Sequence, residues 1–217
     1  MTTVLNACRD RGVAWEAVAR AAEVIRSGGV VAYPTETVYG LGALALREAA
    51  LEEIYGLKQR PRHKPVSILI EGPEELAGLV QTIPTSARAL MARFWPGPLT
   101  LLFLAAEHLP SVVTGAGGKL GVRVSSHPVA RELVRAVGAP ITATSANRSG
   151  APSCRTGDEV LRQLGGRLEF ILDGGLTPGS EGSTIADVTV APPKILRVGA
   201  IAADEVLRCW RQGAALR

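Results

Sequence analysis

Short apolar segments of strand-like length alternate along this chain with longer segments that repeat apolar residues at helical spacing. In the first such pair, apolar residues recur from Trp15 to Ser27, glycines 28 and 29 end the helix, and Pro34 stops the apolar run 30–33. Because this alternation continues to residue 212, it favours an α/β fold with one main sheet. Several strand pairs have no helix between them, so we expect a mixed sheet. The expected helices are 15–27, 47–57, 73–80, 85–94, 128–137, 157–164 and 203–212, and the expected strands are 30–33, 66–70, 99–104, 120–125, 140–144, 169–172, 184–190 and 195–198.

The composition favours a single domain and excludes several classes of protein. Of the 217 residues, 47% are hydrophobic, enough for a sizeable core, so global disorder is excluded. The longest uncharged stretch, 94–106, contains two prolines and is shorter than the ~20 residues of a membrane span. The amino-terminal residues lack the apolar segment of a signal peptide. We therefore expect one domain over residues 1–217, located in the cytoplasm and not associated with a membrane.

Standard catalytic and metal-binding motifs are absent from the sequence. It contains no GxxxxGK[ST], GxSxG or HExxH pattern, and the glycine-rich run at 115–121 has neither the P-loop nor the dinucleotide-binding spacing. The three cysteines form no CxxC pair, and the three histidines are scattered without metal-ligand spacing. We therefore expect no disulfide framework and no metal held by the protein.

A basic segment is the first positive signal for function. Four permanent cations fall within seven residues with no acid between them: Lys58, Arg60, Arg62 and Lys64. Pro61 and Pro65 prevent a helix from continuing through this segment. Arginine and lysine both suit phosphate oxygens, so the segment is a candidate phosphate site, and a solvated basic loop is the other interpretation. The net charge of +4 permits an anionic partner, and the aromatic content of 4% weighs against a stacking platform for single-stranded nucleic acid.

Small polar residues form the second signal, at the end of the strand expected over 140–144. They are Thr142, Thr144, Ser145, Asn147, Ser149 and Ser153. Such groups at a strand end hold ligands in many α/β proteins, although an ordinary turn has the same composition. Weaker candidates are the polar turn after Pro34, the glycine-rich stretch before residue 184, which is a mobile flap or a surface loop, and a lone Arg197 in an apolar strand. Together these segments predict a pocket for a polyphosphate and a polar molecule of amino-acid size.

Seven segments, taken in order, resemble the YrdC/YciO family. They are YPTETVYGLG, KQRPRHKP, FWPGPLT, GVRVSSHP, TSANRSGAPS, GSTIADVT and ILRVGAI. The similarity spans roughly residues 19–201, and we expect the extra carboxyl-terminal domain of longer members to be missing. The resemblance implies a YrdC-like fold, which is a twisted, open, mixed α/β sheet flanked by helices, with a large concave basic surface.

The best characterised members of that family are threonylcarbamoyl-AMP synthases. The resemblance therefore implies a nucleotidyltransferase that makes threonylcarbamoyl-AMP and pyrophosphate from L-threonine, bicarbonate and ATP, for modification of an adenosine in tRNA. It implies that Mg²⁺ arrives with the ATP, and it suggests tRNA, double-stranded RNA or the downstream threonylcarbamoyl-transfer complex as further partners. Two alternatives stay open: a protein that binds double-stranded RNA or assists ribosome assembly, and a YciO-type paralogue that acts on a different adenylate.

The resemblance also implies roles for individual residues. The expected catalytic residues are Lys58 and Arg60, which match the family's K-x-R signature, and Ser145 and Asn147, which match its S-x-N signature. The expected nucleotide-binding residues are Arg60, Lys64, Lys119, Ser145, Ser153 and Arg197. The expected threonine-binding residues are Thr35, Arg123, Ala143 and Ser183, with Arg123 pairing with the threonine carboxylate.

Overall fold

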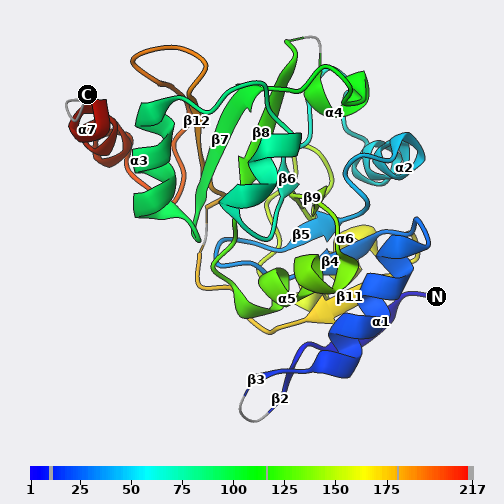
Figure 1. Ribbon diagram of the computed structural model, residues 1–217. Coiled ribbons are helices and arrows are strands. Elements are labelled where there is room, and N and C mark those ends of the chain that lie inside the picture. Colours follow the sequence, from blue (N-terminus) through cyan, green and yellow to red (C-terminus); the bar gives the residue numbers. More distant parts are fainter. Residues whose placement is uncertain (10–11, 116, 180, 215–217) are drawn as a thin grey trace.

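Two mixed sheets contain most of the strands in the computed structural model, which describes residues 1–9, 12–115, 117–179 and 181–214 (Figure 1). The first sheet has, in spatial order, β1 (Thr3–Asn6), β11 (Phe170–Asp173), β4 (Val31–Tyr33), β5 (Gly40–Gly42) and β10 (Thr144–Ser145). The second has, in spatial order, β13 (Lys194–Arg197), β12 (Thr184–Asp187), β7 (Leu99–Leu104), β8 (Lys119–Arg123), β6 (Ile68–Leu69) and β9 (Ile141–Thr142). Both sheets contain parallel and antiparallel pairs, so the predicted mixed character is confirmed.

The expectation of one main sheet is wrong, because the strand predicted over 140–144 changes partners halfway. Its first part, β9, pairs with β6 of the second sheet, and its second part, β10, pairs with β5 of the first sheet. Between them, the backbone N–H of Ala143 donates to the Ser67 carbonyl oxygen at 2.7 Å. This short segment therefore joins the two sheets and puts Ala143 at their junction.

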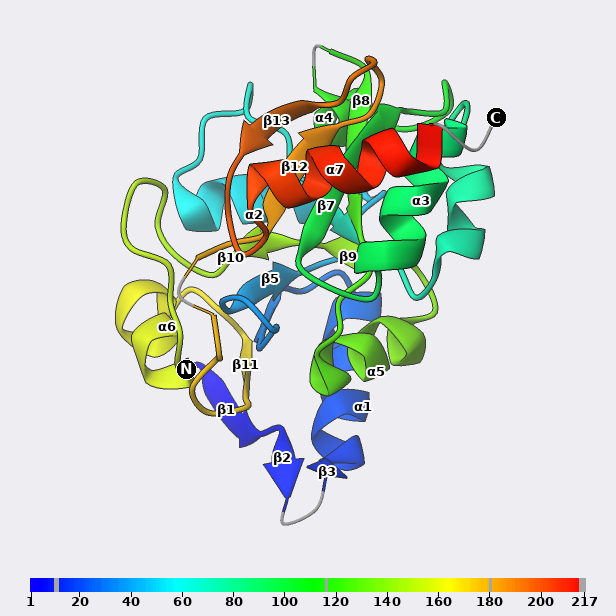
Figure 2. The ribbon, with the colours of Figure 1, turned by 90° about the vertical axis from the view of Figure 1, so that its left-hand side faces the viewer.

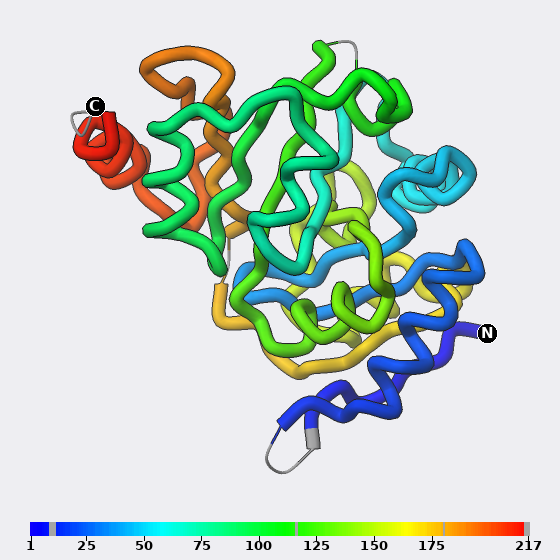
Figure 3. The backbone as a smooth tube through the Cα atoms, viewed as in Figure 1, coloured from blue at the N-terminus to red at the C-terminus, as the bar shows by residue number. Residues whose placement is uncertain are grey.

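Helices cover both sheets. α1 (Trp15–Arg26) and α5 (Pro128–Val137) pack together against the first sheet and share an apolar cluster with β4 and β11 (Figures 1 and 3). α3 (Thr85–Phe94) and α7 (Ala203–Ala214) pack against each other beside the second sheet (Figure 2). The other helices of the described ranges are α2 (Glu48–Lys58), the 3₁₀ helix η1 (Pro73–Gly78), α4 (Ser111–Thr114) and α6 (Gly157–Leu164). Among the residues described, no helix is long and apolar enough to cross a membrane.

Helix α5 illustrates how the local sequence fixes an element. Pro128 lies in its first turn, where its missing N–H costs nothing, and Gly138 ends it with a φ of 72°. Val129, Leu133 and Val137, spaced four residues apart, are buried on one face. Burial of each such side chain contributes about 1.5–3 kcal/mol, so this apolar face fixes α5 against α1 and the first sheet.

Most predicted elements are confirmed in position, and a few differ. The helix predicted over 73–80 is the tighter η1, and the strands predicted over 66–70 and 184–190 are shortened to β6 and β12. Four elements were not predicted from the sequence: β1, β5, α4 and the hairpin of β2 (Cys8–Arg9) with β3 (Gly12–Val13). The GLG sequence of β5 lacks a strand signal because the Tyr33 ring lies over it. A Cβ atom at Gly40 would meet that ring at 2.9 Å.

Candidate functional site

A pocket of about 180 Å³ opens where the two sheets meet, and we call it the junction pocket. Its walls come from the turn between β4 and β5, the segment after α2, the end of β8, the β9–β10 junction and the residues around β12 and β13. Eight of the residues singled out in the sequence line it: Thr35, Arg60, Arg123, Ala143, Ser145, Ser153, Ser183 and Arg197. Segments far apart in the sequence thus meet at one pocket, as the sequence analysis predicts.

Three of the lining residues are arginines, and two of these contact only neutral groups. Arg60 donates from Nε to the Lys64 carbonyl oxygen and from its NH2 group to the Pro65 carbonyl oxygen, both at 3.0 Å. Arg197 donates to the Ser183 carbonyl oxygen at 3.0 and 2.7 Å and to the Ser183 hydroxyl at 3.1 Å. Partial burial and the charges of Arg123 and Arg60 lower the pKa of Arg197. Because guanidinium stays charged, the pocket gathers uncompensated positive charge.

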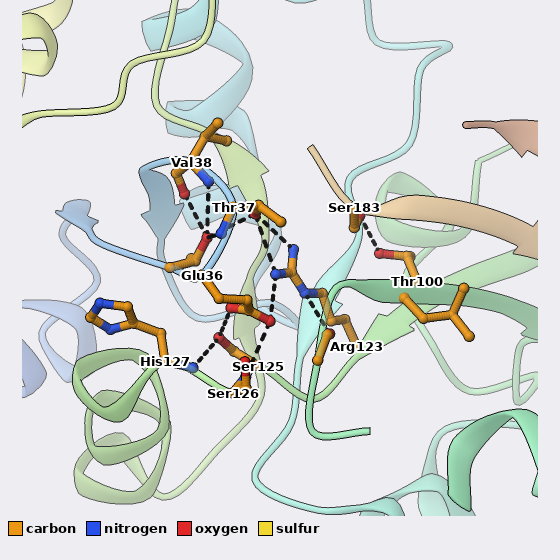
Figure 4. Close-up of polar contacts among 12 residues, drawn as sticks. Glu36, Thr37, Val38, Thr100, Arg123, Ser125, Ser126, His127 and Ser183 are labelled. Carbon is orange, nitrogen blue, oxygen red and sulfur yellow. Dashed lines mark hydrogen bonds and ion pairs between the residues drawn. The ribbon is translucent and has the colours of Figure 1, made fainter. Parts of the chain in front are cut away.

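The third arginine, Arg123, forms a buried ion pair (Figure 4). Its NH2 group lies 2.7 Å from Oε1 of Glu36, and the two side chains are only 8% and 14% exposed. Ser125 donates its hydroxyl to Oε2 of Glu36 at 2.5 Å, and the Ser126 N–H donates to Oε1 at 3.1 Å. Burial alone raises the pKa of Glu36, but the charge and hydrogen bond of Arg123 and the Ser125 hydrogen bond make the net shift downward. The Glu36 carboxylate is therefore ionised and fixed in position.

The hydroxyl of Thr35 is fully engaged within its own turn. It donates to the Val38 carbonyl oxygen at 2.6 Å and lies 2.9 Å from the Thr37 hydroxyl. It also accepts the backbone N–H groups of Thr37 and Val38 at 3.1 and 3.2 Å. Since Thr35 donates its only proton to Val38, the Thr37 hydroxyl must donate to Thr35 and is left as an acceptor for Arg123. Thr35 therefore shapes the pocket wall, with no spare hydroxyl proton for a ligand.

Two predicted catalytic residues, Lys58 and Asn147, do not line the junction pocket. The Lys58 side chain is 1% exposed, and its ammonium donates to the Ser145 carbonyl oxygen, the Asn147 carbonyl oxygen (2.8 Å) and Asn147 Oδ1 (3.3 Å). The Asn147 amide donates to the carbonyl oxygens of Arg148 and Ala151 at 2.9 and 2.7 Å. Burial, aided by Arg60, lowers the pKa of Lys58 to about 7. In this structure, Lys58 and Asn147 hold together the loop that carries Ser145.

The two remaining predicted nucleotide ligands also lie outside the pocket lining. Lys64 is exposed and adjoins Pro65, which lines the pocket. Lys119, at the other end of β8 from Arg123, forms an ion pair with Asp187 at 2.7 Å. That pairing lowers the pKa of Asp187 against the opposing effect of burial. Lys119 is therefore already neutralised by a partner, whereas Lys64 has no printed ion pair within the described residues.

Sequence reasoning missed several residues of the site. Thr37, Ser67 and Thr144 line the pocket, and Glu36 lies behind Arg123. Glu36 and Thr37 belong to the polar turn noted after Pro34, so a signal was present. Nothing in a linear sequence, however, links Glu36 to Arg123, because folding brings them together from different sheets.

The lining of the junction pocket limits its chemistry. No Asp, Glu or His is among the described lining residues, so the ordinary general bases are missing there. Across the described ranges, no group of three His, Cys, Asp or Glu side chains is placed to hold a metal ion. Arginines and hydroxyls suit reactions that depend on positioning and charge neutralisation. The fold and the pocket thus define an α/β protein that binds anions at the junction of two mixed sheets.

The comparisons with known proteins agree with this class. The family model Sua5_yciO_yrdC, described as "Telomere recombination", matches residues 23–199, and the chain belongs to this family. Threonylcarbamoyl-AMP synthase of Pyrococcus abyssi is 43% identical over 206 residues, which cover 95% of this chain and 60% of the relative. A putative threonylcarbamoyl-AMP synthase of Mycobacterium tuberculosis is 37% identical over 199 residues, which cover 92% of this chain and 91% of the relative.

Solved structures share the fold. P. abyssi Sua5 complexed with L-threonine has a TM-score of 0.92 and 41% identity, covering 96% of this chain and 61% of that one. Escherichia coli YciO, with a TM-score of 0.83 and 24% identity, covers 93% of this chain and 98% of its own, and supports the fold alone. The chain spans 55 to 60% of the length of the P. abyssi and Bacillus subtilis synthases that it matches.

Proposed function

We propose that this chain makes threonylcarbamoyl-AMP and pyrophosphate from L-threonine, bicarbonate and ATP, and that residues 1–217 are sufficient as one domain. The observation that carries the proposal is the meeting of three arginines and several hydroxyls in one pocket of a chain from this family. The P. abyssi relative bears the name of that synthase, and its structure was solved with L-threonine. A tRNA adenosine is the proposed final acceptor of the threonylcarbamoyl group.

The proposed reaction has two steps. The threonine amine adds to CO₂ derived from bicarbonate, with loss of water, and gives a carbamate. A carbamate oxygen then attacks the α-phosphorus of ATP, a P–O bond forms, and the bond to the β-phosphate breaks to release pyrophosphate. Negative charge develops on the phosphates in this step, so fixed cations stabilise its transition state. The pocket's lack of a general base is consistent with a nucleophile that is already an anion.

The residues divide between two subsites in this proposal. Arg60, Ser145, Ser153 and Arg197 bind the nucleotide, with Lys64 at the rim and Lys119 able to join only by releasing Asp187. Arg123, Thr35, Ala143 and Ser183 form the threonine subsite, where Thr35 and Ala143 act through shape and backbone. Lys58 and Asn147 support catalysis by fixing the Ser145 loop. We also propose that the pocket opens on a concave basic surface, because Arg197 and the adjoining Lys64 are exposed.

Magnesium fits this site as part of the nucleotide. Glu36, the carboxylate closest to the pocket through its contact with Arg123, is engaged in an ion pair and hydrogen bonds. The lining offers cations and hydroxyls, which repel or only weakly hold a bare divalent ion, whereas Mg²⁺ in such enzymes is commonly bound through substrate phosphates. When bound there, the ion supplies neutralisation of phosphate charge.

Release of pyrophosphate from ATP by the purified chain tests the proposal. We expect release to require both threonine and bicarbonate, each omitted in turn, with an adenylate of threonine as the second product. Pyrophosphate release that ignores threonine would instead favour a paralogue acting on a different adenylate. RNA binding that needs no ATP and falls steeply with salt, without any pyrophosphate release, would favour the RNA-binding alternative.

Substitution of Arg123 by alanine tests the threonine subsite. We expect the KM for threonine to rise about 10- to 100-fold, since a hydrogen bond to a charged group is worth about 1.5–3 kcal/mol. The KM for ATP should stay within about threefold, because the arginines assigned to the nucleotide are untouched. Arg131→Ala, which removes an exposed arginine of α5, is the control. A raised KM for ATP with an unchanged KM for threonine would reverse the two subsites.

A further inference from the structure

The three arginines of the junction pocket differ in how their charge is balanced. Arg60 and Arg197 donate only to carbonyl and hydroxyl oxygens, which leave the full positive charge in place. Arg123 alone of the three has a carboxylate partner in the described structure, Glu36 at 2.7 Å. Opposite charges this close cancel most of each other's field at a distance, and more completely where solvent is excluded. The pocket therefore has a strongly positive part and a nearly neutral part.

The Arg123 guanidinium is also nearly saturated with hydrogen bonds. It has five N–H donors. Nε donates to the Gly97 carbonyl oxygen at 3.2 Å, the NH1 and NH2 groups each donate to the Thr37 hydroxyl at 3.3 Å, and NH2 also faces Glu36. One N–H, on the NH1 group, is left for a ligand. A single remaining donor suits one oxygen of a carboxylate better than the several oxygens of a polyphosphate.

Glu36 acts from behind Arg123 rather than from inside the pocket. Its carboxylate is held by Ser125 and Ser126 and does not belong to the pocket lining (Figure 4). Its three contacts come from β8, the segment that follows β8, and the Arg123 side chain itself. Glu36 is thus placed to set both the orientation and the effective charge of Arg123 without touching a ligand.

We propose that Glu36 is a specificity-determining, positioning residue that keeps polyphosphate out of the amino-acid subsite. With Arg123 neutralised, a polyanion is directed to Arg60 and Arg197, and Arg123 is reserved for the single carboxylate of a zwitterionic amino acid. This inference rests on the proposed function for the assignment of the two subsites. It adds a residue that neither the motif positions nor the pocket lining identify.

Glu36→Gln tests the inference by calorimetric titration with inorganic tripolyphosphate. Glutamine keeps the size of the side chain and an acceptor for Arg123 but removes the charge. We expect the variant to bind tripolyphosphate about tenfold more tightly than the wild-type chain, through the freed charge of Arg123. Glu205→Gln, which removes the same charge from the exposed Arg93–Glu205 pair, should bind it as the wild type does. Equal affinity in the wild type and Glu36→Gln would overturn the inference.

A second variant covers the case in which an unpaired buried Arg123 prevents folding of Glu36→Gln. The double variant Glu36→Gln/Arg123→Gln removes both charges, and removal of a complete buried ion pair is commonly tolerated. We expect its affinity for tripolyphosphate to match the wild type within about twofold, since a balanced pair contributes little. A tenfold loss would mean that Arg123 binds polyphosphate despite Glu36, and would overturn the inference.

Titration with L-threonine separates this inference from the proposed function. In the wild type, we expect the Kd for threonine to be unaffected by saturating tripolyphosphate. In Glu36→Gln it should rise about tenfold, because the polyanion then competes for Arg123. Opposite shifts for the two ligands cannot come from a loss of folded protein. Failure of the wild type to bind threonine would count against the proposed function, whereas the tripolyphosphate comparison decides the role of Glu36 by itself.

Discussion

Replacing Arg60 with alanine should slow pyrophosphate release by about 100-fold or more, because loss of one fixed group that stabilises transition-state charge has effects of this size. Arg60 has the geometry for such a group. Its guanidinium is held by the carbonyl oxygens of Lys64 and Pro65, and no described carboxylate neutralises it. Its position is fixed locally, since Gln59 takes the left-handed conformation that ends α2 and turns the chain toward the pocket. The initial rate at saturating threonine and varied ATP measures the effect.

Arg62→Ala is the matched control for that experiment. Arg62 belongs to the same segment, but its side chain is 75% exposed and pairs with Glu52 at 2.5 Å. Both variants remove one arginine and one positive charge, so a long-range effect of net charge would lower both rates alike. We expect Arg62→Ala to keep the wild-type rate. A folded Arg60→Ala variant with a near-normal rate would contradict the assignment of the nucleotide subsite.

The local elements could be predicted because their signals are local. Apolar spacing, the glycines that end helices and the prolines that stop strands predict α1, α3 and α5 within a residue or two of the observed bounds. The division into two sheets could not be predicted in this way. It depends on β9 and β10 taking different partners on either side of Ala143, and nothing in the apolar pattern of that segment distinguishes its two halves.

The site was predictable in its residue types and less so in its geometry. Motif positions gave eight residues that do line the junction pocket, including Arg60, Arg123 and Arg197. The same motifs gave no indication that the Lys58 ammonium lies inside a loop, because a lysine beside prolines and arginines looks like one more exposed cation. The partner of Arg123 was missed for a different reason. Ion pairs between distant segments depend on the tertiary fold, and many arrangements of these charges fit one sequence.

Lys58→Met should lower the free energy of unfolding by about 2–3 kcal/mol and raise the KM for ATP about tenfold. Methionine fills the space of the lysine stem but leaves three buried oxygens without a donor: the carbonyl oxygens of Ser145 and Asn147, and Asn147 Oδ1. An opposing gain comes from removing the cost of a buried ammonium, the cost that lowers the Lys58 pKa to about 7. Three unpaired acceptors outweigh that gain. Urea unfolding and pyrophosphate release measure the two effects.

The comparison of stability with activity decides how the K-x-R signature works in this chain. Lys194→Met, the same replacement at an exposed position of β13, controls for loss of charge and should change neither quantity. If Lys58 acts by fixing the Ser145 loop, lower stability and weaker ATP binding appear together. A rate loss as large as that of Arg60→Ala, with unchanged stability, would mean that the ammonium leaves the loop and contacts phosphate when ATP binds. Lower stability with a normal KM for ATP would make Lys58 part of the core alone, because its contacts would then have no influence on the nucleotide subsite.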